Sequence, residues 1–170
     1  VGTSTNGAGA FGASLNMLTD AFSEEAYARI STSVGSFNTL RNNVKFSTGL
    51  MNDHFEFSGR LSRVTSDGYV DRAASELDGY FLQGVYNDDN TLIKALLFGG
   101  HEVTYQAWNG ITADQLKNNR TYNSAGEYTD DNGVTQYHDN EIDDYKQDHF
   151  QLHWYETWNS AWNTHLAVHY

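Results

Sequence analysis

The sequence predicts an all-β fold, an antiparallel up-and-down β-barrel that crosses a membrane. Three observations support this prediction. Side chains alternate with a period of two along most of the chain, 14% of the residues are aromatic, and short and long connections alternate. An alternating pattern places apolar side chains on one face of a strand and polar side chains on the other. Short turns at one end and long loops at the other are typical of outer-membrane barrels.

Length and composition narrow the class of protein. With 170 residues the chain is one domain or a piece of a larger one. Its net charge of -12 argues against a nucleic-acid partner, which needs a basic surface. Cysteine is absent, so disulfides and a thiol nucleophile are excluded. No run approaches the roughly 18 apolar residues of a membrane helix. The strands of a membrane barrel produce no such run.

The strand predictions rest on alternation, and no helical period extends over a useful window. The pattern is clearest over residues 150–159 and 162–170, which we interpret as a hairpin with one apolar and one polar face. The other expected strands are 26–34, 43–50, 55–64, 79–87 and 91–105. This gives seven strands, whereas bacterial single-chain barrels have an even number. We therefore expect the chain to be a piece of a longer protein.

The connections suggest an orientation. The expected long links are 37–42, 66–78 and 107–147, and the expected short turns are 51–54, 88–90 and 159–161. In an outer-membrane barrel the long links face outward and the short turns face the periplasm. Trp158 and Trp162 flank the last short turn, as residues of an aromatic girdle do. An ordinary β-sandwich with aromatic core positions is the alternative.

Several stretches resemble one family. Residues 1–16, VGTSTNGAGAFGASLN, resemble the end of the plug domain in TonB-dependent outer-membrane receptors, especially those of Bacteroidetes-type bacteria. Four downstream stretches are similar to the first barrel strands of the same receptors: 37–50, 59–73, 94–111 and 140–154. The resemblance implies that residues 1–20 end a plug domain. It also implies that residues 21–170 begin a barrel of 22 strands, of which seven are present.

The resemblance also implies a function and partners. The expected function is TonB-energised uptake of a scarce nutrient across the outer membrane of a Gram-negative bacterium. TonB would act through the missing N-terminal part of the plug, and the barrel would contact outer-membrane lipid. The ligand class is open between ferric siderophores, haem, cobalamin and glycans, and we favour a ferric siderophore or a similar iron chelate. The alternative is a surface or secreted glycan-binding module without transport. No catalytic constellation is visible, so we do not expect an enzyme.

The candidate ligand-binding residues are Trp108, Arg120 and Tyr122, in the long link 107–147. Aromatic faces stack on flat rings or sugars, and an arginine can clamp a negative charge. The acidity of residues 127–148 is an objection, because it repels an anionic ligand.

No cofactor is expected. The acidic loop contains an incomplete match to a calcium-binding loop, in which Asp130, Asn132, Gly133 and Asp139 fall on positions 3, 5, 6 and 12. Position 1 is then Tyr128, and position 12 requires glutamate, so the match fails. A solvated loop is the expectation, and weak calcium binding is the alternative.

Arg60, His153 and His165 are expected to face the lumen. His149 and His153 lie four residues apart, which on a strand separates them by about 13 Å, too far to share a metal ion. Across the terminal hairpin, His153 and His165 are expected to be diagonal neighbours on the polar face. We therefore expect a polar lining rather than a metal site.

Overall fold

The computed structural model describes residues 22–170, so the expected end of a plug domain lies outside the described residues. The regular secondary structure of the described part is almost entirely β. Its strands are β1 (Ala26–Val34), β2 (Leu40–Thr48), β3 (Phe55–Ser66), β4 (Ser75–Asn87), β5 (Thr91–Tyr105), β6 (Glu127–Thr129), β7 (Thr135–Tyr137), β8 (Ile142–Asn159) and β9 (Trp162–His169). One short helix, α1 (Ala113–Asn118), lies between β5 and β6.

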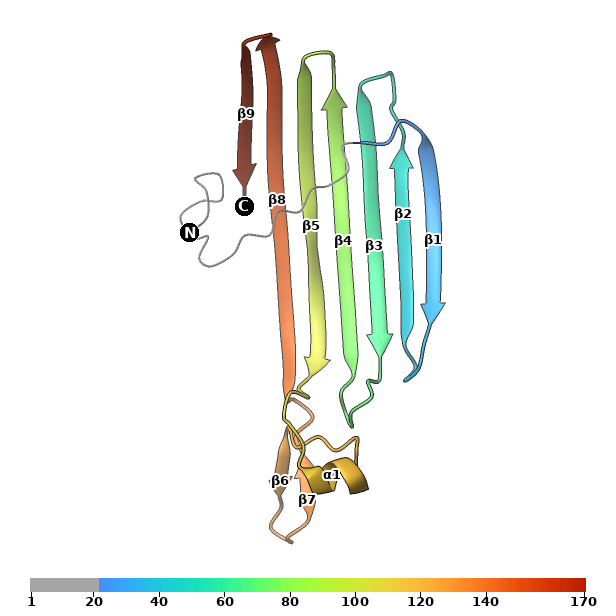
Figure 1. Ribbon diagram of the computed structural model, residues 1–170, viewed down its shortest axis with the longest axis vertical. Coiled ribbons are helices and arrows are strands. Elements are labelled where there is room, and N and C mark those ends of the chain that lie inside the picture. The colour runs from blue at the N-terminus through green and yellow to red at the C-terminus, as the bar shows by residue number, and fades with distance from the viewer. Residues whose placement is uncertain (1–21) are drawn as a thin grey trace.

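Seven of the strands form one antiparallel sheet in the order β1-β2-β3-β4-β5-β8-β9. Figure 1 shows them side by side, with α1 and the β6–β7 hairpin beyond the end of the sheet where β5 joins β8. This confirms the prediction of an all-β antiparallel fold with seven main strands. Among residues 22–170, no strand pairs with the outer edge of β1 or of β9.

The long links are shorter than expected. β2 begins at Leu40, β4 at Ser75 and β8 at Ile142, and each added segment is paired with its neighbour along its length. The predictions for 37–42, 66–78 and 107–147 were therefore wrong in their bounds. Both faces of the added segments carry mostly polar side chains, so no alternation of hydrophobicity marks them.

A helix in the third link was also not predicted. Thr112 caps α1: its hydroxyl accepts a hydrogen bond from the backbone N–H of Gln115, and the Gln115 side chain accepts one from the backbone N–H of Thr112. This capping box, T-x-x-Q, is a signal that the sequence carries. None of the helices in residues 22–170 is long and apolar enough to cross a membrane.

The strand register divides the sheet into two faces. We call one the apolar face, because it is apolar over the part of the sheet nearest the short turns. Its apolar residues there include Ala28, Val44, Phe46, Phe57, Leu61, Leu82, Leu97, Phe150, Leu152, Leu166 and Val168. The opposite polar face carries Lys45, Ser47, Glu56, Arg60, Gln83, His149, His153 and His165, together with Val85 and Leu96.

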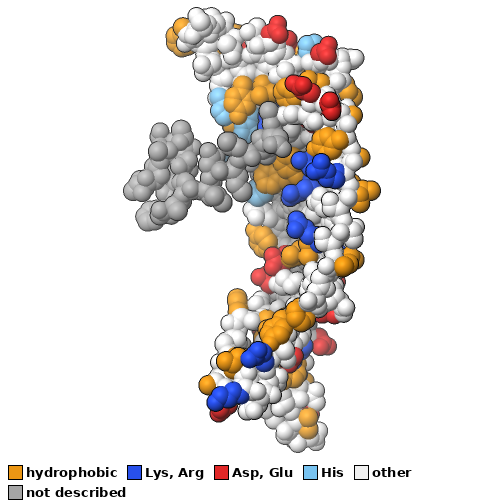
Figure 2. Space-filling model, turned by 45° about the vertical axis from the view of Figure 1, so that its right-hand side comes forward, with side chains coloured by type: hydrophobic (Ala, Val, Ile, Leu, Met, Phe, Trp, Pro, Cys, Tyr) orange, Lys and Arg blue, Asp and Glu red, His pale blue; other side chains and the backbone are white. Residues whose placement is uncertain are grey.

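Burial is inverted between the two faces. The buried side chains of the sheet all belong to the polar face: Ser47, Glu56, Gln83, Val85 and Leu96. On the apolar face, Leu61 is 51% exposed, Leu97 41% and Leu166 54%. Figure 2 shows hydrophobic side chains at the surface along the sheet. An antiparallel sheet in water usually shows the opposite arrangement, with its apolar face packed on a core and its polar face solvated.

Candidate functional site

A row of ionisable side chains, which we call the charged row, crosses the apolar face toward the long links. Paired through the register, it runs Arg63, Asp78, His101, Lys146. Arg63 lies 2.9 Å from Glu76 and 3.5 Å from Asp78, His101 lies 2.6 Å from Asp144, and Lys146 lies 3.7 Å from Asp148. All of these pairs are exposed, and such pairs contribute only about 0–1 kcal/mol each to stability. Their importance is therefore in marking where the apolar surface ends.

A groove of about 470 Å³ lies along this boundary. Its apolar side includes Leu61 and Tyr80, and its charged side includes Arg63 and Asp78. Most of its lining side chains belong to the apolar face, so the groove is separate from the polar face and from the loops. It is the position at which an apolar surface meets a charged one.

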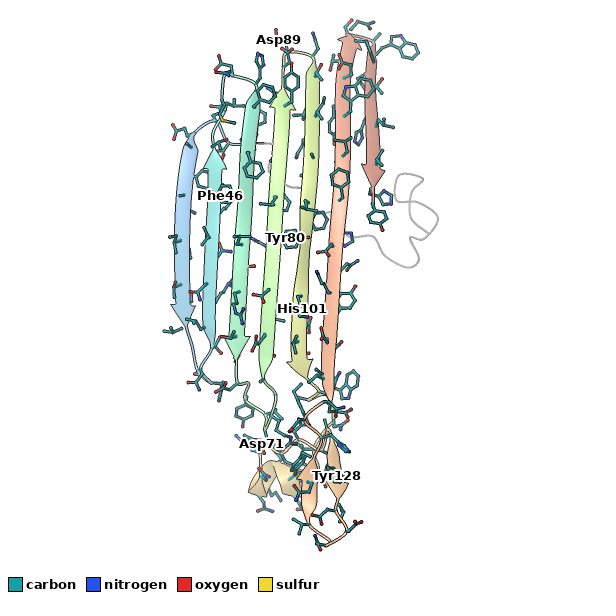
Figure 3. All side chains as sticks on the ribbon, turned by 180° about the vertical axis from the view of Figure 1, so that it is seen from behind. Phe46, Asp71, Tyr80, Asp89, His101 and Tyr128 are labelled. Atoms are coloured by element: carbon teal, nitrogen blue, oxygen red, sulfur yellow. The ribbon has the colours of Figure 1, made fainter. Side chains whose placement is uncertain are left out.

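Aromatic rings gather at the opposite end of the apolar face, beside the short turns. The rings of Phe55 and Tyr86 lie 5.2 Å apart, and those of Trp154 and Trp158 lie 6.3 Å apart at an angle of 86°. Figure 3 shows Phe46 toward this end, Tyr80 near the middle and His101 toward the long links. The face is therefore divided into an aromatic end, an apolar middle and a charged row.

The loop platform, which we define as links 67–74 and 106–141, is held together by Asn123. The side chain of Asn123 is buried, at 2% exposure, and its Nδ2 donates to the carbonyl oxygens of Asp71 and Gln106, at 3.1 and 2.9 Å. Its Oδ1 accepts a hydrogen bond from the backbone N–H of Ala125 at 3.0 Å. One buried amide thus joins the end of β5 to both long links.

Arg72 adds a second connection within the loop platform. Its guanidinium carbon lies 3.5 Å from the ring centroid of Tyr137 and 5.7 Å from that of Tyr105. The same guanidinium donates a hydrogen bond to the carbonyl oxygen of Asn123. A cation stacked on a tyrosine face stabilises by about 0.5–2 kcal/mol, with larger values where water is excluded. The links are therefore ordered by specific contacts. No pattern in the sequence singled out Arg72 or Asn123.

The three predicted ligand-binding residues differ in their exposure and hydrogen bonds. Trp108 is 80% exposed, and the side chain of its neighbour Asn109 donates to the hydroxyl of Ser124 at 2.9 Å, which anchors the backbone beside it. Arg120 is also exposed. The hydroxyl of Tyr122 instead donates to the carboxylate of Glu127, and this hydrogen bond raises the pKa of Tyr122. Tyr122 is thus tied into the loop platform.

The incomplete calcium loop forms the turn of the β6–β7 hairpin. Oδ1 of Asp130 accepts hydrogen bonds from the backbone N–H groups of Val134 and Asn132, both at 2.9 Å, and these bonds lower the pKa of Asp130. Gly133 adopts the left-handed conformation that the turn requires, with φ of 77°. Within residues 22–170, no group of three or more His, Cys, Asp and Glu side chains is placed to hold a metal ion. Weak calcium binding stays a prediction.

The residues expected to line a lumen all lie on the polar face. Arg60 pairs with Lys45 and Phe81 in the register. Nδ1 of His153 lies 3.3 Å from Nε2 of His165, so these two are diagonal neighbours, as the hairpin register predicted.

Comparison of the chain with protein-family models, with curated proteins and with solved structures found no match.

Proposed function

We propose that this chain is part of a TonB-dependent outer-membrane receptor that imports a scarce nutrient, with a ferric siderophore or similar iron chelate as the favoured ligand. The single observation that supports it most strongly is the inverted burial. Large apolar side chains such as Leu61 and Leu166 are exposed on one face, while Glu56 and Gln83 are buried on the other. An apolar outer surface and a polar interior are what a membrane barrel requires.

The dimensions of the apolar face agree with this proposal. Asp78 and Asp88 bound the apolar part of β4 and lie ten residues apart. At ~3.3 Å per residue this is about 33 Å along the strand. A strand tilt of 35–45° reduces the height to about 25 Å, the usual thickness of the apolar band of such barrels. The aromatic end and the charged row then lie at the two levels where the bilayer meets water.

The open edges of the sheet fit the same proposal. A closed barrel has no free strand edge, whereas β1 and β9 each have one in the described residues. Further strands of a longer protein would pair with these edges. The number 22 comes from the family resemblance alone. In this arrangement Arg60, His153 and His165 face the lumen, where the plug would lie.

Ligand capture is assigned to the loop platform. Binding residues are commonly held on loops that a rigid scaffold positions, and Asn123 and Arg72 give these links defined contacts. Trp108 and Arg120 are exposed there and remain the candidates for contact with a ligand. Tyr122 is the weaker candidate, because its hydroxyl is already bound to Glu127.

The test uses the full-length protein in its own bacterium. We expect the protein in the outer-membrane fraction and expect its deletion to abolish growth on one ferric chelate as sole iron source. Replacing Trp108 and Arg120 together with Ala should reduce that growth, whereas replacing Asp114, an exposed residue of α1, with Ala should not. A protein recovered only in the soluble or secreted fraction would overturn the proposal.

One observation favours the glycan-binding alternative. The 80% exposure of Trp108 provides the flat apolar platform on which sugar rings stack. A surface glycan binder without transport would bind polysaccharide through Trp108 yet leave nutrient uptake unchanged on deletion. Polysaccharide binding by whole cells, measured beside iron uptake, separates the two functions.

A further inference from the structure

We propose that His153 and His165 form a two-imidazole binding site for a divalent transition-metal ion on the polar face of the β8–β9 hairpin. The two residues come from different strands, because Tyr155 pairs with His165 and His153 pairs with Ala167. Their rings are inclined by only 14°, and Nδ1 of His153 lies 3.3 Å from Nε2 of His165. The proposal depends on this geometry and does not require a membrane location.

The hydrogen bonds of His153 indicate that its facing nitrogen, Nδ1, carries a lone pair and no proton. Nε2 of His153 lies 3.1 Å from Oε1 of Gln151, and an amide oxygen is only an acceptor. Nε2 therefore carries the proton of the neutral ring, and the lone pair is on Nδ1, directed at His165. Metal-binding histidines are usually oriented in this way, with the second ring nitrogen donating to an oxygen.

His165 is held in place by stacking. Its ring lies 4.1 Å from the ring of Tyr155, with 7° between the planes. In the metal-free arrangement Nε2 of His165 carries the proton that Nδ1 of His153 accepts. When a metal ion binds, that proton moves to Nδ1 of His165 through water, and both facing nitrogens become ligands. The ion then replaces the shared proton and lies off the line between the two nitrogens, because each nitrogen–metal bond at a tetrahedral centre makes roughly 35° with that line. Each ring turns to direct its lone pair at the ion.

The spacing matches the requirement of a metal ion. With bonds of about 2.0–2.1 Å, two nitrogen ligands on a tetrahedral centre lie roughly 3.3–3.4 Å apart, against the 3.3 Å found between these two nitrogens. Imidazole ligands suit zinc, copper and nickel, whereas calcium and magnesium require oxygen ligands. The other coordination positions fall to water or to donors of an incoming ligand. Lys94 of β5 is paired with His153 of β8 in the register. Its positive charge repels a metal cation, so we expect moderate affinity for the ion.

The test is a titration of the purified full-length protein with Cu²⁺, followed by electron paramagnetic resonance, and with Zn²⁺, followed by calorimetry. We expect one saturable site with hyperfine splitting from two imidazole nitrogens. His153→Asn and His165→Asn should each weaken binding at least tenfold. Gln151→Leu, which removes the orienting acceptor, should weaken it by about tenfold or more.

The matched control is His169→Asn, which removes a histidine of the same hairpin and the same face and should leave affinity unchanged. Each variant must keep the thermal unfolding midpoint of the parent protein. His153→Gln and His165→Gln replace any variant that does not. The proposal is overturned if the parent shows no saturable binding below about 1 mM, or if folded variants of both histidines bind as the parent does.

Discussion

The guanidinium of Arg72 lies over the ring of Tyr137, with 3.5 Å between the guanidinium carbon and the ring centroid. The two residues belong to different long links, so this contact fixes one link against the other. Asn123 completes the connection by accepting a hydrogen bond from Arg72 at its carbonyl oxygen and donating to Asp71 from its side chain. The loop platform is thus a small folded unit at the end of the sheet (Figure 3).

Arg72→Lys should loosen the loop platform while keeping the charge. An ammonium lacks the planar surface that stacks on Tyr137 and the fixed fork that reaches the carbonyl oxygen of Asn123. We expect a loss of about 1–3 kcal/mol of local stability, measured as faster limited proteolysis within 106–141. Arg120→Lys is the control. It changes an exposed arginine within 106–141 and should leave cleavage of that link unchanged. Equal protection of the two variants would show that Arg72 does not hold the links together.

The alternation of the sequence predicted the strands because each apolar stretch has its partners on one face. The terminal hairpin, with Leu166 opposite Trp154, is the clearest case. Alternation failed where both faces are polar, as in the first half of β8, because the pairing there depends on backbone hydrogen bonds that leave no hydrophobic signal. The links between Arg72, Asn123 and Tyr137 depend on long-range contacts, and no local pattern encodes them.

Gly99→Ala should disturb the sheet far more than Gly84→Ala. A Cβ at Gly99 would lie 2.3 Å from the carbonyl oxygen of Gln147, on the backbone of β8, so the two strands would have to separate. At Gly84, on the same face, a Cβ meets nothing within 4 Å. Overpacking of this kind costs typically 1–3 kcal/mol. Thermal unfolding of the two variants measures the difference, and equal midpoints would contradict this account of Gly99.

The β6–β7 turn should lose order in acid. The N–H groups of Val134 and Asn132 lower the pKa of Asp130 in the folded state. Ionised Asp130 therefore stabilises the turn at pH values above the pKa of an ordinary aspartate, which is ~4. That stabilisation is lost as the pH falls below this value. A spin label at Asp131 should become more mobile between pH 6 and 3. Asp130→Asn retains the accepting oxygen and should abolish the transition. An unchanged transition in this variant would assign the pH dependence to another group.

Leu61→Arg and Arg60→Leu test the two faces at adjacent positions of β3. If the apolar face contacts lipid, a charge on it costs about 2–4 kcal/mol at the bilayer midplane and less toward the charged row, where Leu61 lies, whereas the polar face tolerates substitution. Leu61→Arg should therefore lower the amount of assembled protein in the outer membrane, and Arg60→Leu should not. Immunoblots of membrane fractions measure both. Similar levels for the two variants would count against a lipid-facing surface.

The orientation of the sheet is tested by cysteine labelling of whole cells with a reagent that does not cross the outer membrane. The protein lacks cysteine, so each introduced thiol is unique in these 170 residues. Asn132, exposed at the β6–β7 turn, should label as Cys in intact cells. Asn52, exposed in a short turn, should label only after the cells are broken. Ala125 is unsuitable because it is only 5% exposed. Labelling of Asn52→Cys but not of Asn132→Cys in intact cells would reverse the orientation. The loop platform would then face the periplasm, and its assignment to ligand capture would fail.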